Sequence, residues 1–141
     1  MVLNPRSEKN LAGVHPKLVS VVRRAADVSD IEFMVIEGLR TIDRQKQLVA
    51  KGASKTMNSK HITGHAVDLA PMVDGEIRWD WGLYLPLASA MKNAAQDVGV
   101  DVKWGGTWDL LYKLKEPITA DVLHKKFPDG PHFEIDPETY P

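Results

Sequence analysis

Two short polar stretches carry side chains that could bind a metal ion and activate water. One spans residues 59–68, which read SKHITGHAVD, and the other spans residues 129–134, which read DGPHFE. A zinc-dependent hydrolase needs three imidazole or carboxylate ligands and an open fourth position for the water that it activates. His61, Asp68 and His132 can supply these three ligands. Together the two stretches predict a catalytic zinc site.

The second stretch also offers a carboxylate for proton transfer. Asp129, three residues before His132, has the type and position expected of a general base that takes a proton from the attacking water. A purely local role competes with this one, because Asp followed by Gly and Pro favours a turn, and both roles can hold at once. Glu134 lies two residues beyond His132 on the same face of an expected strand, so it could instead orient that ligand.

The sequence also contains part of a second metal-binding motif, but that motif is incomplete. His61 and His65 are four residues apart, as in the helical HExxH motif, which requires a Glu directly after the first His. Ile62 occupies that position, and the residues that follow it, Thr63 and Gly64, are poor helix formers. We therefore expect His65 to line the cleft or to be solvated rather than to bind the metal.

The composition is that of one ordinary globular domain. The chain has 141 residues, of which 43% are hydrophobic and 26% are charged, and this length allows a buried core. The formal net charge of −1 gives no indication of the basic surface that nucleic-acid binding requires. Cysteine is absent, so thiolate ligands and a disulfide scaffold are excluded. Zinc must therefore be bound by His and carboxylate side chains.

The spacing of the candidate ligands resembles a family of zinc peptidases that act on peptidoglycan. The family includes D-alanyl-D-alanine carboxypeptidases and dipeptidases, and phage endolysins that cut the L-alanyl-D-glutamate bond. Its SxHxxGxAxD pattern, which is followed much later by a carboxylate-x-x-His, is complete here as Ser59, His61, Gly64, Ala66 and Asp68. Further segments resemble family landmarks over most of the chain: residues 38–41 (GLRT), Gln45 and residues 104–108 (WGGTW).

The resemblance implies roles for residues outside the ligand set. It places the family's general base at Asp129, and it places the guanidinium of Arg40 near the scissile carbonyl or a substrate carboxylate. Such a donor stabilises charge that develops in the transition state. Ser59 is expected to hydrogen-bond the substrate, and Gln45 is expected to support the site. Of the two tryptophans in residues 104–108, at most one should border the cleft.

One position departs from the family pattern. Many relatives carry an acidic residue between the glycine pair and the second tryptophan, where this chain has Thr107. The resemblance is therefore weaker evidence for the substrate specificity than for the metal site. The segment from Thr107 to Phe127 resembles an insertion that could form part of the cleft wall.

The function expected from these observations is that of a phage endolysin which cleaves the L-alanyl-D-glutamate bond of the peptidoglycan stem peptide. A D-alanyl-D-alanine carboxypeptidase or dipeptidase is the alternative among enzymes, and a non-catalytic, zinc-stabilised peptidoglycan-binding module is the alternative outside them. The chain shows neither the apolar core of a secretory signal nor an apolar run that could span a bilayer. We therefore expect a monomer, without nucleic-acid or membrane partners, that stays in the host cytoplasm until a separate membrane-permeabilising protein releases it.

Hydrophobic periodicity predicts the elements that position the two stretches. Helices are expected over 16–28, from Thr41 as N-cap to Gly52, and from about 81 to Gly99. Strands are expected over 31–36, 67–71, 100–104 and 132–135, with a hairpin turn at Asp74-Gly75. The second helix should turn one stripe inward, formed by Ile42, Gln45, Leu48 and Val49. The second strand should stop at Pro71.

These elements indicate an α+β fold, with a small antiparallel sheet and helices packed on one side. The family resemblance implies the same hedgehog/D-Ala-D-Ala peptidase-like fold. Residues 1–141 are expected to form a single catalytic domain without a separate wall-binding domain. That architecture would suit a lysin that acts on the thin wall of a Gram-negative host.

Overall fold

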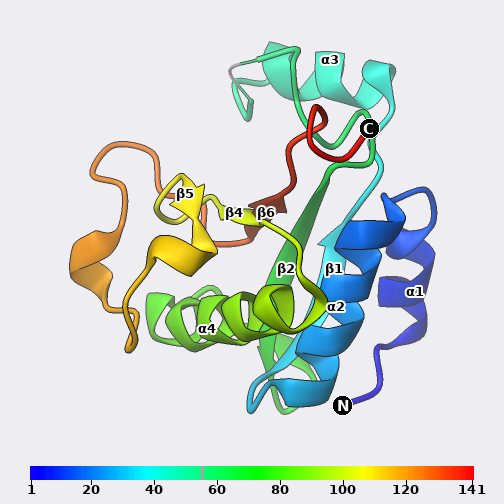
Figure 1. The fold of residues 1–141 in the computed structure, drawn as a ribbon. Coiled ribbons are helices and arrows are strands. Elements are labelled where there is room, and N and C mark those ends of the chain that lie inside the picture. Colours follow the sequence, from blue (N-terminus) through cyan, green and yellow to red (C-terminus); the bar gives the residue numbers. More distant parts are fainter. Residues whose placement is uncertain (55) are drawn as a thin grey trace.

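A twisted antiparallel sheet runs through the centre of the computed structural model, which describes residues 1–54 and 56–141 (Figure 1). Its strands follow the order β1-β2-β6-β4-β5, and β3 pairs with the end of β2. The strand bounds are β1 (Glu32–Glu37), β2 (Ala66–Val73), β3 (Glu76–Ile77), β4 (Lys103–Trp104), β5 (Asp109–Leu110) and β6 (His132–Glu134). All of these pairings are antiparallel. The α+β architecture is confirmed.

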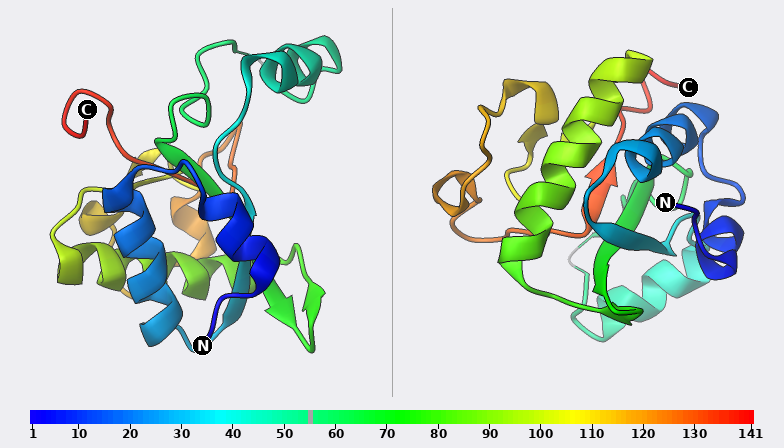
Figure 2. Two further views of the ribbon diagram at one scale, coloured as in Figure 1. Left: turned by 90° about the vertical axis from the view of Figure 1, so that its right-hand side faces the viewer. Right: turned by 90° about the horizontal axis from the view of Figure 1, so that it is seen from below.

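Two helices cover one face of the sheet and form the core with it (Figure 2). These are α2 (Pro16–Val28) and α4 (Trp81–Val98), and they pack against each other. The core side chains of α2 are fully buried at the predicted helical spacing, as Leu18, Val21, Val22 and Ala25. Strand alternation turns Val67 and Leu69 of β2 into this core, so Asp68 between them faces the opposite side of the sheet.

A further short helix, α1 (Pro5–Leu11), was not predicted from the sequence. Asn4 caps it by accepting a hydrogen bond from Ser7 N at 2.8 Å, and Pro5 occupies its first position. The helix lies along β1, where Ser7 Oγ accepts from Val35 N at 2.9 Å and Asn10 Nδ2 donates to Val35 O at 2.8 Å. It therefore occupies backbone groups at the edge of the sheet that would otherwise be open to pairing.

The helix α3 (Ile42–Ala50) differs from the prediction in the face that it buries. Thr41 caps it as expected and accepts from Arg44 N at 3.0 Å. Gln45 is fully buried and Leu48 and Val49 are half-buried, but Ile42 is 57% exposed, so the predicted inward stripe is wrong at Ile42. The reason is its location: α3 stands beyond the end of the sheet, away from the apolar core (Figure 1). Its inward face meets polar groups of the site instead.

The strand β2 also differs from the prediction, because it continues past Pro71 to Val73. Pro71 pairs with Phe33 of β1, while its carbonyl accepts from Arg78 N at 2.9 Å on the side of the β3 hairpin. The N–H that proline lacks falls on that same side, so the ladder to β1 stays intact. The predicted hairpin turn is confirmed at Asp74 and Gly75, which both have positive φ angles of 52° and 80°.

The last third of the chain is less regular than the rest. The strand expected over 100–104 is confined to β4, and the segment from Thr107 to Phe127 holds β5 and two 3-10 turns, Leu111–Lys113 and Ala120–Val122. Gly99 closes α4 in the left-handed conformation, with φ of 72°, as predicted. Within residues 1–54 and 56–141, no helix combines the length and apolarity needed to cross a bilayer.

Candidate metal centre

The sheet register brings two of the predicted ligands together. Asp68 of β2 lies directly opposite His132 of β6. On its other side Asp68 is paired with Glu37 of β1, because an irregularity between Val35 and Glu37 shifts the register there. Neighbouring side chains in one row of a sheet share a face. The row formed by these three residues therefore presents polar groups on the face that lies away from the core.

The third predicted ligand, His61, comes from the loop before β2. Its Nε2 lies 3.1 Å from Asp68 Oδ1, and Nδ1 of His132 lies 3.4 Å from the same oxygen. The candidate donor atoms of His61, Asp68 and His132 all lie within 4.8 Å of one another. Both imidazoles are buried. The structure thus brings together the three side chains that the sequence nominated, in a cluster that could bind a metal ion.

Each imidazole is fixed by a second partner at its other nitrogen. His61 Nδ1 lies 2.8 Å from Gly38 O, and His132 Nε2 lies 2.8 Å from Glu134 Oε1. When Nδ1 of His61 and Nε2 of His132 donate to these oxygens, the remaining nitrogen of each ring is free to act as a ligand. Two neutral imidazoles and one carboxylate form a donor set suited to zinc. The residues therefore fit such an ion.

Hydrogen bonds between the histidines and the carboxylates shift the pKa values within the cluster. Burial alone would raise the pKa of Asp68, but hydrogen bonds from His132 and His61 outweigh it and hold that pKa well below its usual range. Burial alone would lower the pKa of His132, but hydrogen bonds to Asp68 and Glu134 raise it to about 9. The site is therefore prepared for a positive charge between these carboxylates.

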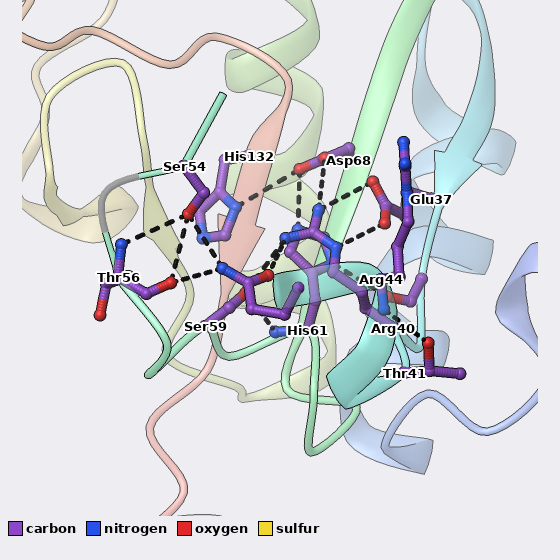
Figure 3. A network of polar contacts seen from close by, with 12 residues as sticks. Glu37, Arg40, Thr41, Arg44, Ser54, Thr56, Ser59, His61, Asp68 and His132 are labelled. Atoms are coloured by element: carbon purple, nitrogen blue, oxygen red, sulfur yellow. Dashed lines mark hydrogen bonds and ion pairs between the residues drawn. The ribbon is translucent and has the colours of Figure 1, made fainter. Parts of the chain in front are cut away.

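Arg40 is held in a dense polar network beside the ligands (Figure 3). Its Nε and Nη2 donate to the two carboxylate oxygens of Glu37 at 2.6 and 2.8 Å. Its Nη1 donates to Gln45 Oε1 at 2.7 Å and makes a longer contact of 3.4 Å with Ser59 Oγ. Its Nη2 also lies 4.0 Å from Asp68 Oδ2. The guanidinium is thereby fixed in position and orientation next to the candidate metal centre.

Gln45 connects this network to the segment that follows α3. It accepts from Arg40 through Oε1, while Nε2 donates to Ser54 Oγ at 2.9 Å and to Thr56 O at 2.5 Å. Its partners Arg40, Ser54 and Thr56 are labelled in the close view (Figure 3). The buried amide therefore uses both of its ends. Gln45 thus contacts Arg40 but does not line the cleft within the described part of the chain.

Asp129 stands at the cleft beside His132, and a glycine makes its position attainable. His132 N donates to Asp129 O at 3.2 Å, and Asp129 N donates to Gly105 O at 2.9 Å. A Cβ atom on Gly105 would lie 2.4 Å from Asp129 O, so only glycine fits there. Burial and the charge of Asp68 raise the pKa of Asp129. Its backbone thus forms the local turn that the sequence favoured, while its side chain reaches the cleft.

The cleft over this cluster has a volume of about 620 Å³. Its lining includes all three candidate ligands together with Arg40, Ser59, Lys60, Asp129 and Glu134. Trp108 also borders it, with a ring centroid 5.3 Å from that of His132. Trp104, by contrast, is fully buried and stacks on Phe133 in the core. The expectation that at most one of these tryptophans borders the cleft is therefore confirmed.

His65 is not placed as the sequence predicted. It is buried rather than solvated, and it is absent from the described lining of the cleft. Its Nδ1 lies 2.8 Å from Thr63 Oγ1, and its Nε2 lies 2.6 Å from Tyr140 O. The ring also packs against His15 at a centroid distance of 5.2 Å. His65 ties the motif loop to the end of the chain, a contact between distant segments that sequence spacing cannot reveal.

Glu37 is a site residue that the sequence analysis missed. It faces the cleft, pairs with Arg40 and lies beside Asp68 in the sheet. A signal was present, because Glu37 precedes Arg40 by three residues at the end of a predicted strand. The register shift that turns Glu37 toward the site rather than the core is not visible in the sequence.

Comparison with known proteins agrees with this arrangement. The family model of the phage L-alanyl-D-glutamate peptidase matches residues 1–135. The L-alanyl-D-glutamate peptidase of Escherichia phage T5 is 37% identical over 133 residues, which cover 92% of this chain and 93% of that protein. The enzyme of the same name from Listeria phage A118 is 29% identical over 138 residues, which cover 96% of this chain and 42% of that protein.

A solved structure extends the agreement to three dimensions. The crystal structure of the Serratia marcescens L-Ala D-Glu endopeptidase ChiX superposes with a TM-score of 0.82 at 41% sequence identity. The match covers 99% of this chain and 94% of that chain. The fold, the family model and the similarity to the T5 protein all indicate the same family. This chain belongs to the phage L-alanyl-D-glutamate peptidase family.

Proposed function

We propose that this protein is a zinc-dependent endolysin which hydrolyses the amide bond between L-alanine and D-glutamate in the peptidoglycan stem peptide. One observation carries the proposal: ligand atoms of His61, Asp68 and His132 converge within 4.8 Å in a cleft that also holds Asp129 and Arg40. The names of the phage T5 and Serratia marcescens relatives support the choice of bond.

Zinc is the metal that we propose for His61 Nε2, Asp68 Oδ1 and His132 Nδ1. Bound there, it would polarise the scissile carbonyl and make a water molecule nucleophilic near neutral pH. The protein contributes the orientation of the ligands: Gly38 O fixes one imidazole and Glu134 fixes the other.

Asp129 is proposed to move the proton. Its carboxylate accepts a proton from the attacking water and returns one to the departing D-glutamate amine. The raised pKa of Asp129, caused by burial and by the charge of Asp68, suits a group that must both take up and release a proton. The fixed turn between Asp129 and His132 keeps this carboxylate beside the ligands.

Arg40 is proposed to stabilise the negative charge that forms on the carbonyl oxygen. Its Nη1 makes a long contact of 3.4 Å with Ser59 Oγ, so one N–H is only weakly engaged and can be donated to the substrate. Ser59 then has its hydroxyl available for the substrate as well. The bonds to Glu37 and Gln45 keep the guanidinium preorganised, which is the condition for a large electrostatic effect.

We further propose the form in which the enzyme works and the place where it acts. Residues 1–141 act as a single catalytic domain and work as a monomer on the stem peptide. The site of action is the wall in the periplasm of a Gram-negative host. A separate membrane-permeabilising protein gives the enzyme access to it. The cleft and the family relationship support the peptidoglycan substrate.

The test compares wild type with Asp129→Asn in a turbidity assay on outer-membrane-permeabilised Gram-negative cells. Zinc content is measured on both proteins, and Asp121→Asn serves as a matched control on the exposed Ala120–Val122 turn. We expect Asp129→Asn to keep its zinc and to lose roughly 10²- to 10⁴-fold in rate. Lysis at the wild-type rate would reduce Asp129 to a turn residue and make Glu134 the next candidate.

Mass spectrometry of the digested muropeptides decides which bond is cut. New N-terminal D-glutamate supports the proposed endopeptidase, whereas released D-alanine supports a D-alanyl-D-alanine carboxypeptidase or dipeptidase. A zinc-loaded protein that sediments with cell walls but never lowers their turbidity would instead be a binding module.

A further inference from the structure

The substrate of the proposed reaction carries a negative charge close to the bond that is cut. Glutamate has two carboxyl groups, and the peptide can continue through only one of them. The D-glutamyl residue on the amine side of the scissile bond therefore keeps a free carboxylate. At neutral pH this group is ionised. A cleft that accepts it must provide a cation or leave the charge uncompensated.

The cleft is otherwise unfavourable for a carboxylate. Its lining includes the acidic side chains of Glu37, Asp68, Asp129 and Glu134. Arg40 is already assigned to the carbonyl oxygen of the scissile bond, and Glu37 binds its guanidinium through two hydrogen bonds. Among the described residues that line the cleft, Lys60 carries the other permanent positive charge. It is the natural counterion for an anionic substrate group.

Lys60 is also placed between two residues of the site and held by its backbone. Ser59 and His61 flank it, and His61 N donates to Ser59 Oγ at 3.2 Å. The carbonyl of Lys60 accepts from His65 N at 2.9 Å and from Thr63 Oγ1 at 3.3 Å. These bonds fix the turn that carries the side chain. The backbone from which the Lys60 side chain extends is therefore fixed next to His61.

The Lys60 side chain is not paired with another residue in the described part of the chain. Within residues 1–54 and 56–141 its ammonium makes no hydrogen bond or ion pair. Burial alone would raise the pKa of Glu134, but the hydrogen bond with His132 lowers it, and the charge of Lys60 adds a smaller effect. The pKa of Asp136 is lowered mainly by hydrogen bonds from Glu138 N and Thr139 Oγ1, again with a smaller effect of Lys60. A second cavity of about 390 Å³ shares Lys60 and Glu134 with the metal cleft. Lys60 thus lines both cavities.

We infer that Lys60 is a specificity-determining residue, whose ammonium binds the free carboxylate of the D-glutamyl residue next to the scissile bond. This inference rests on the proposed function. It assigns to the chain a preference for an anionic residue on the amine side of the bond. The contact exists in the bound substrate and in the transition state alike, so its loss should appear mainly in KM.

The experiment uses two peptides that differ in one group. Both contain an L-alanyl-D-glutamyl bond, but the carboxyl that does not carry the chain is free in one peptide and is a carboxamide in the other. Zinc-loaded wild type, Lys60→Gln and Lys60→Arg are compared by kcat/KM on both. Lys103→Gln is the matched control, because Lys103 lines the second cavity but is absent from the described lining of the metal cleft.

We expect wild type to prefer the free carboxylate by roughly 10- to 100-fold, the range of a hydrogen bond between charged groups. Lys60→Gln should lose this preference by slowing only on the acid peptide, Lys60→Arg should keep most of it, and Lys103→Gln should resemble wild type. Equal rates of wild type on both peptides, or an unchanged preference in Lys60→Gln, would overturn the role of Lys60 and leave the proposed function standing. Failure of wild type to cleave either peptide would instead reject the proposed function, and the inference with it.

Discussion

Nε2 of His132 lies 2.8 Å from Oε1 of Glu134, two residues further along the same strand. The contact follows from strand geometry, because side chains at i and i+2 share a face of the sheet. It leaves Nδ1 of His132 facing Asp68. Glu134 therefore determines which nitrogen of the imidazole can act as a ligand.

Removal of the Glu134 carboxylate should weaken metal binding. We expect Glu134→Ala to lower zinc affinity roughly 10- to 100-fold, since partners of ligating histidines have effects of this size. Glu134→Gln keeps an acceptor oxygen and should lose less. Competition with a chromophoric chelator measures the affinities, with the exposed Glu138→Ala as control. Equal affinities in all four proteins would show that the hydrogen bond to His132 does not orient it.

Arg40 should not be replaceable by lysine. An ammonium cannot reproduce the paired bonds to Glu37 together with the bond to Gln45. We expect Arg40→Lys to retain zinc and to lose roughly 10²- to 10³-fold in kcat, as for the loss of one oxyanion donor. Kinetics with metal analysis decide this, and the exposed Arg44→Lys should behave as wild type. A variant that loses its zinc would point to a structural role instead.

The buried amide of Gln45 should matter for stability as well as for activity. Gln45→Leu is close in size but leaves Arg40 Nη1 and Thr56 O without this partner. An unsatisfied buried polar group costs about 1–3 kcal/mol, so the free energy of unfolding should fall by an amount in that range. Urea titration measures it, and Gln47→Leu on the exposed face of α3 is the matched control. Similar values for both variants would contradict the importance of the network.

Metal removal should lower the melting temperature. A ligand at 100 times its dissociation constant stabilises the folded state by about 2.7 kcal/mol. For a domain of this size that corresponds to roughly 5–10 °C. Calorimetry with zinc and with a chelator measures the shift, and His61→Ala should show almost none. An equal shift in that variant would place the stabilising metal elsewhere on the protein.

Gly105 should tolerate no side chain. A Cβ atom there would lie 2.4 Å from Asp129 O and 3.0 Å from His132 Cβ, and the first of these atoms belongs to the backbone. We expect Gly105→Ala to displace the turn that carries both residues and to reduce zinc affinity and activity together. Gly82→Ala, where nothing lies within 4 Å, is the control and should be neutral or slightly stabilising. Wild-type kinetics in Gly105→Ala would show that the turn adapts.

The sequence was most informative where function and local spacing coincide. We could name the three candidate ligands because each lies in a short stretch whose residue spacing forms a recognisable pattern. They are His61, Asp68 and His132. Helix α2 could be delimited because its apolar residues follow the helical period over its whole length. The helix depends on an apolar spacing that repeats along the chain, whereas the ligands depend on a fixed local spacing within each of two stretches.

The features that escaped prediction depend on contacts between distant segments. Glu37 reaches the site only because β1 shifts register against β2, and His65 is buried by the end of the chain. In α3 the hydrophobic pattern was misleading: Ile42 stays exposed because this helix packs on a polar network. Periodicity predicts that a face is buried, but it does not say what buries it.

The segment between Gly106 and Pro128 is closed at its base by short backbone bonds. Asp129 N donates to Gly105 O at 2.9 Å, Gly105 N donates to His132 O at 2.7 Å, and His124 N donates to Gly106 O at 2.7 Å. These bonds join Gly105 directly to Asp129 and His132, so exchanges of exposed residues within the segment, such as Tyr112 and Val122, need not alter the spacing of the candidate ligands. The candidate metal centre and part of its cleft wall are thus supplied by separate stretches of the chain, so we expect substitutions in that wall to change substrate preference without rebuilding the site.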